Sequence, residues 1–228
     1  MLNTIDEIIH HYRTVLKGAE SKAKSTKDRA YGGVIRAQKG KLWETIAHSL
    51  ILISWQELGG KKSRIEINSS KIQIPINTTY AQKNNHIPRI GNFSYDLSVD
   101  KHIFIDKKFV IGIECKAYTE NAMLKRILTD FTFLTLLYKN LICFLFQGES
   151  QLGGDYCDHP VNNNDCYGSE PTHTIISQFP IDLHICTVLQ GNRKVDEPIH
   201  KPEFYKDIDE ERLIVIKDKF KDKLASYI

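Results

Sequence analysis

The segment from Lys108 to Phe146 constrains the fold more than any other part of the chain. It holds an apolar run, KFVIGIECKAY, then an amphipathic helical pattern over residues 119–140, then a second run, LICFLF, with no charged residue. One stripe of the helical pattern is apolar and consists of Met123, Ile127, Phe131, Leu134 and Tyr138. Two apolar runs joined by such a helix are typical of neighbouring parallel strands whose connecting helix covers one face of the sheet.

Helix and strand patterns elsewhere complete a layered fold. Helical patterns cover residues 4–16, 41–58 and 207–228, and strand-like segments cover 63–70, 71–76, 93–99, 101–105 and 181–191. We expect a hairpin turn at residues 68–70 and a three-stranded meander formed by residues 93–99, 101–105 and 108–118. The sequence therefore predicts the α/β (α+β) class, with a central mixed β-sheet flanked by helices.

Length and charge pattern predict how the chain is organised. With 228 residues, the chain can bury one substantial core. We expect a single domain over residues 1–228, with a polar insertion at about 148–174 and a basic segment at about 17–41. The basic segment holds eight Lys or Arg residues against two acids, which suits either a phosphate-bearing partner or a solvated surface.

Composition bears on the cellular compartment. The sequence has no apolar run long enough to cross a membrane, and its first residues lack the apolar core of a signal peptide. Its five cysteines are an odd number, and three of them lie in strand-like apolar runs, so we expect no disulfide framework. These features predict a cytoplasmic protein with no membrane anchor.

A charged pair interrupts the first apolar run. Because side chains alternate across a strand, Glu114 and Lys116 share one face, while Ile111, Ile113 and Cys115 share the other. Buried charges are costly unless they pair with each other or take part in metal or phosphate chemistry. An ion pair on a solvated face is the simpler interpretation, and the acids upstream favour the chemical one.

Two further acids can reach the same point. Asp96 lies on a neighbouring strand-like segment, and Glu44 lies near the start of the helical pattern at 41–58. Carboxylates from adjacent strands suit a hard divalent cation such as Mg²⁺, which binds oxygen and keeps part of its shell for water or phosphate. Lys116 would then position the attacking water or help deprotonate it.

These residues resemble the PD-(D/E)XK nuclease superfamily, and specifically its type II restriction endonucleases. The resemblance rests on Asp96, on Glu114-x-Lys116 and on the helix and apolar strand that follow, and it covers roughly residues 41–147. It implies a restriction-endonuclease-like core in which Asp96, Glu114 and the backbone carbonyl of Cys115 hold Mg²⁺. It also implies that Lys116 serves the water nucleophile and that Glu44 is the acid of the first core helix.

The same resemblance implies an activity and partners. The expected reaction is Mg²⁺-dependent, sequence-specific hydrolysis of double-stranded DNA, which leaves a 5′-phosphate and a 3′-hydroxyl. A palindromic target would imply a twofold-symmetric homodimer. A cognate DNA methyltransferase is expected in the same system.

The sequence departs from the motif at one position, and two residues compete for the role of its first acid. Tyr95 stands where the motif has proline. Asp100 competes with Asp96 for the role of first acid, because it is nearer to Glu114 in sequence. We favour Asp96, since Asp100 falls where the strand is predicted to turn.

Polar and basic side chains around the predicted centre are candidates for DNA contacts. Residues 77–92 form a predicted loop that enters the Asp96 strand, and a helix begins directly after Lys116, where phosphate contacts are favoured. The candidates are Lys39, Lys41, Gln82, Lys83, Asn84, Asn85, Arg89, Asn121, Lys125 and Arg126. Residues 190–194, QGNRK, form a weaker candidate of the same kind, and the insertion at 148–174 could contact DNA or, through its Cys and His residues, a metal.

Two alternatives stay open at this point. A DNA repair or junction-resolving nuclease of the same superfamily would use the same centre. A DNA-binding protein without catalysis would use the basic and polar segments but would not need the acids beside Lys116. A protein for small phosphorylated ligands is disfavoured, because no glycine-rich phosphate loop follows a strand.

Overall fold

The protein is described by a computed structural model. The described residues are 2–25, 31–69, 72–75, 94–97, 99–154, 156, 168–197 and 201–228. Two long helices begin the chain, α1 (Ile5–Ser25) and α2 (Tyr31–Glu57). α2 therefore starts ten residues before the helical pattern predicted from the sequence, and both helices extend into the basic segment.

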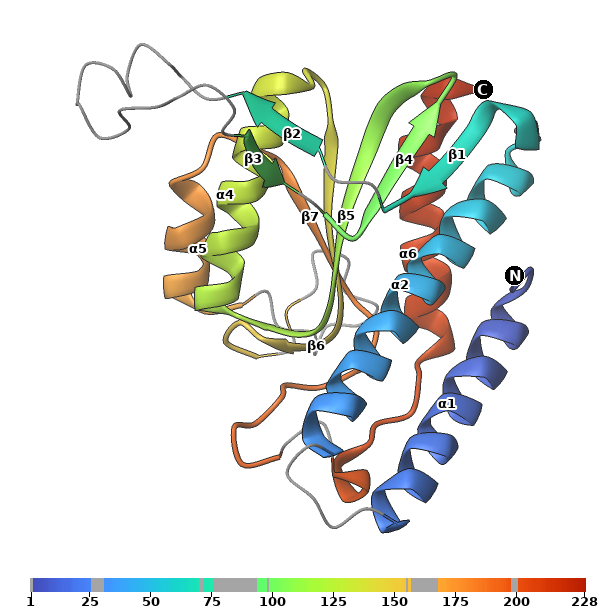
Figure 1. The fold of residues 1–228 in the computed structure, drawn as a ribbon, viewed down its shortest axis with the longest axis vertical. Helices are drawn as coiled ribbons and strands as arrows, with labels where there is room; N and C mark the ends of the chain where they lie inside the picture. The colour runs from blue at the N-terminus through green and yellow to red at the C-terminus, as the bar shows by residue number, and fades with distance from the viewer. Residues whose placement is uncertain are drawn as a thin grey trace.

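A five-stranded mixed sheet forms the centre of the molecule (Figure 1). Its strands are β1 (Ile65–Asn68), β4 (Lys101–Ile105), β5 (Lys108–Glu120), β6 (Ile142–Gln151) and β7 (Leu183–Thr187), in this spatial order. β1, β4 and β5 pair antiparallel, whereas β5, β6 and β7 pair parallel. The predicted central mixed sheet flanked by helices is confirmed.

β5 is the middle strand, and local sequence explains its two connections. Asp106 and Lys107 turn the chain from β4 into β5 with positive φ angles of 49° and 66°, as the tight turn of a hairpin requires. After β5, α4 (Asn121–Leu137) crosses over the sheet and returns the chain to β6. The predicted strand–helix–strand crossover is thus present.

Two predicted strand pairings are wrong. β1 pairs with β4, and β2 (Ile72–Pro75) does not join β1 in a hairpin. β2 pairs instead with β3 (Ser94–Leu97) in a separate two-stranded sheet, so β3 is not the outer strand of the predicted meander. Alternating apolar residues show that a segment is a strand, but they do not select its partner.

Helices cover both faces of the central sheet (Figure 1). On one face, α1, α2 and the C-terminal helix α6 (Glu210–Leu224) share a core with Ile111, Ile113 and Phe144. On the other face, α4 covers Leu145 and Ile185, and α5 (Glu170–Ser177) packs beside it. The sheet is therefore buried on both sides, as parallel strands usually are.

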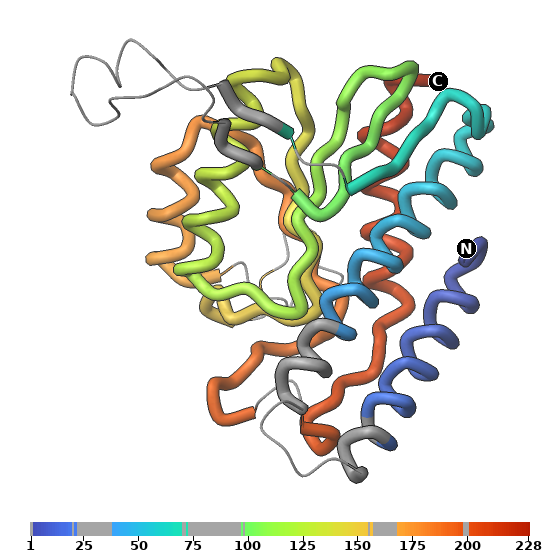
Figure 2. The backbone as a smooth tube through the Cα atoms, in the orientation of Figure 1, coloured from blue at the N-terminus to red at the C-terminus, as the bar shows by residue number. Residues whose placement is uncertain are grey.

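Close packing fixes α2 against the sheet. A Cβ atom on Gly148 of β6 would lie 2.4 Å from the ring of Trp43 on α2, so only glycine fits there. Short 3-10 turns complete the chain at Lys62–Arg64, Pro202–Phe204 and Ala225–Tyr227. Figure 2 follows the backbone from α1 to the end of the chain beside β4.

The remaining polar segments are only partly described. β6 runs to Gln151 and α5 begins at Glu170, so regular structure enters both ends of the predicted insertion. Residues 155 and 157–167 lie outside the described part of the chain, as does the whole predicted loop at residues 77–92. Among the helices that are described, none combines the length and apolarity needed to span a membrane.

Candidate active site

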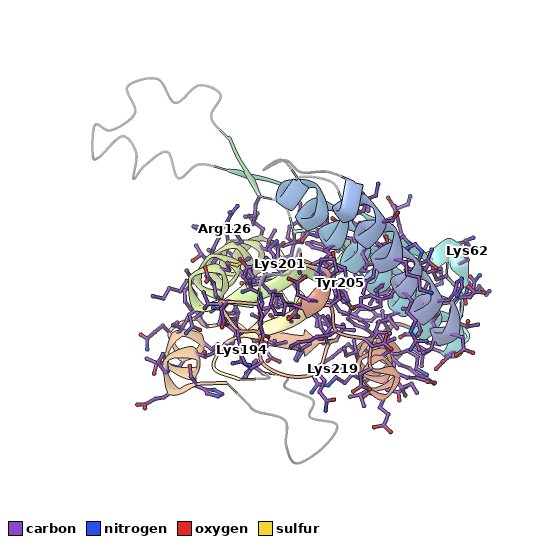
Figure 3. All side chains as sticks on the ribbon, turned by 90° about the horizontal axis from the view of Figure 1, so that it is seen from below. Lys62, Arg126, Lys194, Lys201, Tyr205 and Lys219 are labelled. Atoms are coloured by element: carbon purple, nitrogen blue, oxygen red, sulfur yellow. The ribbon has the colours of Figure 1, made fainter. Side chains whose placement is uncertain are left out.

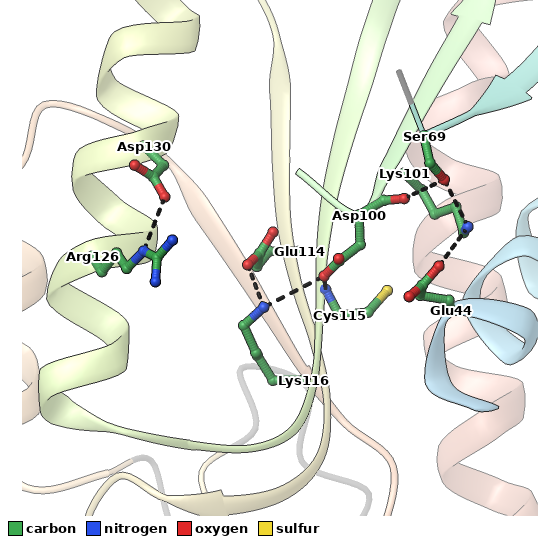
Figure 4. Close-up of polar contacts among 9 residues, drawn as sticks. All are labelled: Glu44, Ser69, Asp100, Lys101, Glu114, Cys115, Lys116, Arg126 and Asp130. Carbon is green, nitrogen blue, oxygen red and sulfur yellow. Dashed lines mark hydrogen bonds and ion pairs between the residues drawn. The ribbon is translucent and has the colours of Figure 1, made fainter. Parts of the chain in front are cut away.

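β5 presents the charged pair on the face that looks toward α4. Ile111, Ile113 and Cys115 point into the core beneath α2 and α6, as the predicted alternation requires. Glu114 and Lys116 point the other way, and the Lys116 ammonium donates a hydrogen bond to the Glu114 carboxylate (Figure 4). Their side chains are 15% and 28% exposed, so solvent and ligands can still reach the lysine.

Asp100 joins this pair because of where β4 begins. The β4–β5 ladder starts with Lys101 opposite Ile113, so the backbone N–H of Cys115 lies just beyond the ladder. That N–H donates to the Asp100 carboxylate at 2.7 Å. The same carboxylate oxygen lies 3.5 Å from the Lys116 ammonium. Asp100, Glu114 and Lys116 therefore meet at one point on the central strand.

Asp96 belongs to the two-stranded sheet and not to the central sheet. It sits on β3, opposite Gln73 of β2, in the two-stranded sheet. Its side chain lies outside the described part of the structure, whereas every described carboxylate contact of Lys116 is made by Asp100 or Glu114. The role of Asp96 stays a prediction, and the geometry favours the competing residue Asp100.

Glu44 reaches the site indirectly. Its carboxylate accepts a hydrogen bond from the Lys101 ammonium at 2.8 Å. Lys101 also donates to the Ser69 hydroxyl at 2.9 Å, and that hydroxyl donates to the backbone carbonyl of Asp100 at 2.8 Å. A polar chain thus ties α2 to the start of β4. Beside it lies a cavity of about 320 Å³, lined by Lys41, Glu44, Thr45, His48, Ser49 and Lys101.

Comparison with known proteins decides the family. The chain is 49% identical over 226 residues to the type II restriction enzyme DdeI of Desulfomicrobium norvegicum, and the match covers 94% of this chain and 89% of that protein. The chain belongs to the type II restriction enzymes. No family model and no solved structure matches the chain.

The restriction enzyme holds its central carboxylate in an unusual electrostatic setting. Burial raises the pKa of Glu114 to about 7, with Lys116 opposing this shift and the charge of Asp100 adding to it. Burial works to lower the pKa of Lys116, but the carboxylates of Glu114 and Asp100 outweigh burial and raise it. Without metal, Lys116 is therefore charged at neutral pH and Glu114 is readily protonated.

This raised pKa has a measurable effect on stability. The folded enzyme binds the Glu114 proton more tightly than the unfolded chain, whose glutamate has a pKa near 4.5. The stabilising contribution is therefore complete below about pH 4.5 and is lost as the pH rises through about 7. We expect the free energy of unfolding of wild type, relative to Glu114→Gln, to fall by about 1–3 kcal/mol between pH 5 and pH 8.5. Urea unfolding in EDTA measures this difference, and a difference that is constant with pH would contradict the assignment.

The predicted DNA-contact residues are placed as follows in the restriction enzyme. On α2, Lys39 is buried and Lys41 is exposed beside the 320 Å³ cavity. Asn121 begins α4, where its side-chain oxygen accepts a hydrogen bond from Thr172 at 2.8 Å. Lys125 and Arg126 are exposed on α4, and Arg126 lies 3.8 Å from Asp130. Gln82, Lys83, Asn84, Asn85 and Arg89 lie outside the described residues.

Two further charged residues at this site, Asp130 and Lys101, are not predicted from the sequence. Asp130 faces the site from α4, where burial raises its pKa and the charges of Arg126 and Lys116 oppose that shift. Helical spacing offers a signal for it, because Asp130 lies four residues after Arg126. Lys101 neutralises Glu44, and no local pattern distinguishes it from other lysines near turns.

Proposed function

We propose that this restriction enzyme hydrolyses phosphodiester bonds of double-stranded DNA at a specific sequence, in a reaction that depends on Mg²⁺. The observation that carries the proposal is the convergence of Asp100, Glu114 and Lys116 on β5 in a chain of this family. In the PD-(D/E)XK motif we assign the first acid to Asp100 in place of Asp96. The Glu-x-Lys part of the motif is then Glu114 and Lys116.

The residues at this point fit a hard cation. Two carboxylates converge there, and the adjoining Cys115 carbonyl is a third oxygen donor of the kind that Mg²⁺ accepts. Asp100 and Glu114 would hold the ion together with that carbonyl, while Glu44 is already neutralised by Lys101. When bound, Mg²⁺ would stabilise negative charge on phosphate oxygens and lower the pKa of water.

The side chains themselves supply orientation and charge. The Cys115 N–H holds the Asp100 carboxylate in place, and Lys116 holds Glu114. Because its pKa is raised, Lys116 acts as a charged donor to the phosphate or to the attacking water. Water attacks phosphorus and loses its two protons: the 3′ oxygen takes up one as its bond to phosphorus breaks, and solvent takes up the other. The products are a 5′-phosphate and a 3′-hydroxyl.

The assembly and the biological setting belong to the same proposal. A palindromic target would be cut by a twofold-symmetric homodimer, because the symmetry of the protein then matches the symmetry of the site. The enzyme would act in the cytoplasm, beside a cognate DNA methyltransferase. The family favours this function over a repair nuclease or a DNA-binding protein without catalysis.

Digestion of a long, sequence-diverse DNA tests the function. We expect wild type to give discrete bands on a gel with Mg²⁺ and uncut DNA with EDTA, and sequencing of the fragment ends will map the target. Ligation without prior treatment will show the 5′-phosphate. Intact DNA in Mg²⁺, or a smear without defined ends, would contradict sequence-specific cleavage.

A further inference from the structure

A second group of basic side chains lies where β5 and β6 end. The segment after β7 adds to the end of β6, because Asn192 bridges to Ser150 and the backbone N–H of Arg193 donates to the Ser150 carbonyl at 2.9 Å. This places the Arg193 guanidinium 3.8 Å from the centre of the Tyr118 ring. Tyr118 belongs to β5, the strand that carries Glu114 and Lys116.

Arg193 has no acidic partner among the described residues. Its Nη1 donates to the side-chain oxygen of Gln151 at 2.5 Å, and its Nε is buried without a hydrogen-bond acceptor in the described structure. By contrast, Arg13 and Arg64 pair with Asp207 and Asp106, both at 2.7 Å. No carboxylate of the described residues therefore neutralises the guanidinium, and its charge is left for an anion that binds beside it.

Lys39 adds a second cation to this group. It is 7% exposed, and its ammonium lies 4.0 Å from the centre of the Tyr205 ring. Burial lowers its pKa to about 8, and the charge of Arg193 contributes to the shift, while Glu149 opposes it. The Glu149 carboxylate also lies 3.4 Å from the Lys206 ammonium. Among the described residues, Glu149 thus interacts with both Lys39 and Lys206, and Arg193 adds a third positive charge, which leaves net positive charge for an anion.

The position of this group relates it to the active site. Tyr118 follows Lys116 by two residues on the same face of β5, a distance of about 7 Å along the strand. DNA rises about 3.4 Å per nucleotide along its axis, so this distance corresponds to about two nucleotides. Figure 3 views this end of the molecule from below, where Lys194, Lys201 and Tyr205 lie.

We propose that Arg193, stacked on Tyr118 and supported by Lys39, binds a DNA backbone phosphate within about two nucleotides of the cleaved bond. This inference rests on the proposed function. An arginine fork suits the oxygens of a phosphate, and the neutral Tyr118 and Gln151 hold that fork without consuming its charge. Arg193 is a positioning residue, since it would fix the register of the DNA over Lys116.

Binding measurements on the full-length enzyme test this role. A short duplex with the mapped target is titrated by fluorescence anisotropy, with Ca²⁺ in place of Mg²⁺ and at several salt concentrations. We expect Arg193→Met to weaken binding about tenfold and to reduce the salt slope by about one, whereas Arg193→Lys retains the slope. Arg64→Met is the matched control, because Arg64 also lies over an aromatic ring, Trp55, but is neutralised by Asp106. It should leave both quantities unchanged.

Uncharged methylphosphonate linkages identify which backbone phosphate Arg193 contacts. Duplexes with one methylphosphonate at each position near the cut are bound to wild type and to Arg193→Met. At one position within about two nucleotides of the cut, the neutral linkage should weaken wild type and leave the variant unaffected. If the variant is poorly folded, the wild-type scan still tests the inference. A wild type that binds equally well with a neutral linkage at every position in that window would overturn it.

The two proposals fail in different ways. An enzyme that cuts DNA but shows the same methylphosphonate profile with and without Arg193 overturns the phosphate contact and leaves the function standing. Equal effects of Arg193→Met and Arg64→Met would also overturn the contact. A wild type that cuts no DNA overturns both proposals.

Discussion

Replacing Lys116 with methionine should slow DNA cleavage by about 10²–10³-fold and leave DNA binding nearly intact. Lys116 supplies the one ammonium that contacts both Asp100 and Glu114 in the described site. Removal of a charged donor aimed at the reacting group slows such reactions by about 10²–10³-fold. Single-turnover cleavage with enzyme in excess measures this loss, because it separates chemistry from binding.

Lys62→Met is the matched control for this experiment. Lys62 is an exposed lysine on the turn before β1, and Figure 3 shows it on the opposite side of the molecule from Arg126 of α4. Its removal changes the net charge equally and should leave the cleavage rate unchanged. Cleavage by Lys116→Met within tenfold of wild type would show that the lysine is only half of a structural ion pair.

Local pattern was sufficient to predict the centre of the fold. The run around Ile111 and Ile113, the amphipathic helix after it and the second apolar run became β5, α4 and β6. The shared face of Glu114 and Lys116 follows from the period of two along a strand. This alternation depends only on neighbouring residues, so it is the same whichever strands β5 pairs with.

Strand pairing could not be predicted in the same way. The segment containing Asp96 is a strand, as expected, but its partner is β2 and not β4. Many strands have the same alternating pattern, and the choice among them depends on contacts between distant parts of the chain. The expectation that Asp96 lies on a strand of the same sheet as the charged pair depends on the meander, which β3 does not join.

The turn position of Asp100 brings this residue into the site and does not exclude it. From the sequence, the predicted turn at Asp100 favours Asp96 as the first acid. In the structure, the β4–β5 ladder ends before Cys115, so the Cys115 N–H has no partner on β4. The Asp100 carboxylate accepts a hydrogen bond from this N–H. An aspartate at the end of a strand is thus held in place by a backbone group. The contact of Arg193 with the Tyr118 ring could not be predicted from the sequence either, because 75 residues separate the two.

The substitution Asp100→Asn should be as damaging as the loss of Lys116. The asparagine amide would keep an oxygen for the Cys115 N–H, so the fold is expected to survive, but the change would remove the negative charge that holds a cation. We expect Asp100→Asn to reduce the single-turnover rate in Mg²⁺ by at least about 10²–10³-fold. Thermal unfolding of the variant should remain close to that of wild type, which separates lost chemistry from lost structure.

The most direct test of the account compares Asp100→Asn with Asp96→Asn. Both variants are assayed in parallel on the mapped duplex, in saturating Mg²⁺, with enzyme in excess. We expect Asp100→Asn to be inactive on the timescale of wild-type cleavage and Asp96→Asn to cut within about threefold of wild type. An inactive Asp96→Asn beside an active Asp100→Asn would contradict the assignment of Asp100, Glu114 and Lys116 as the catalytic centre.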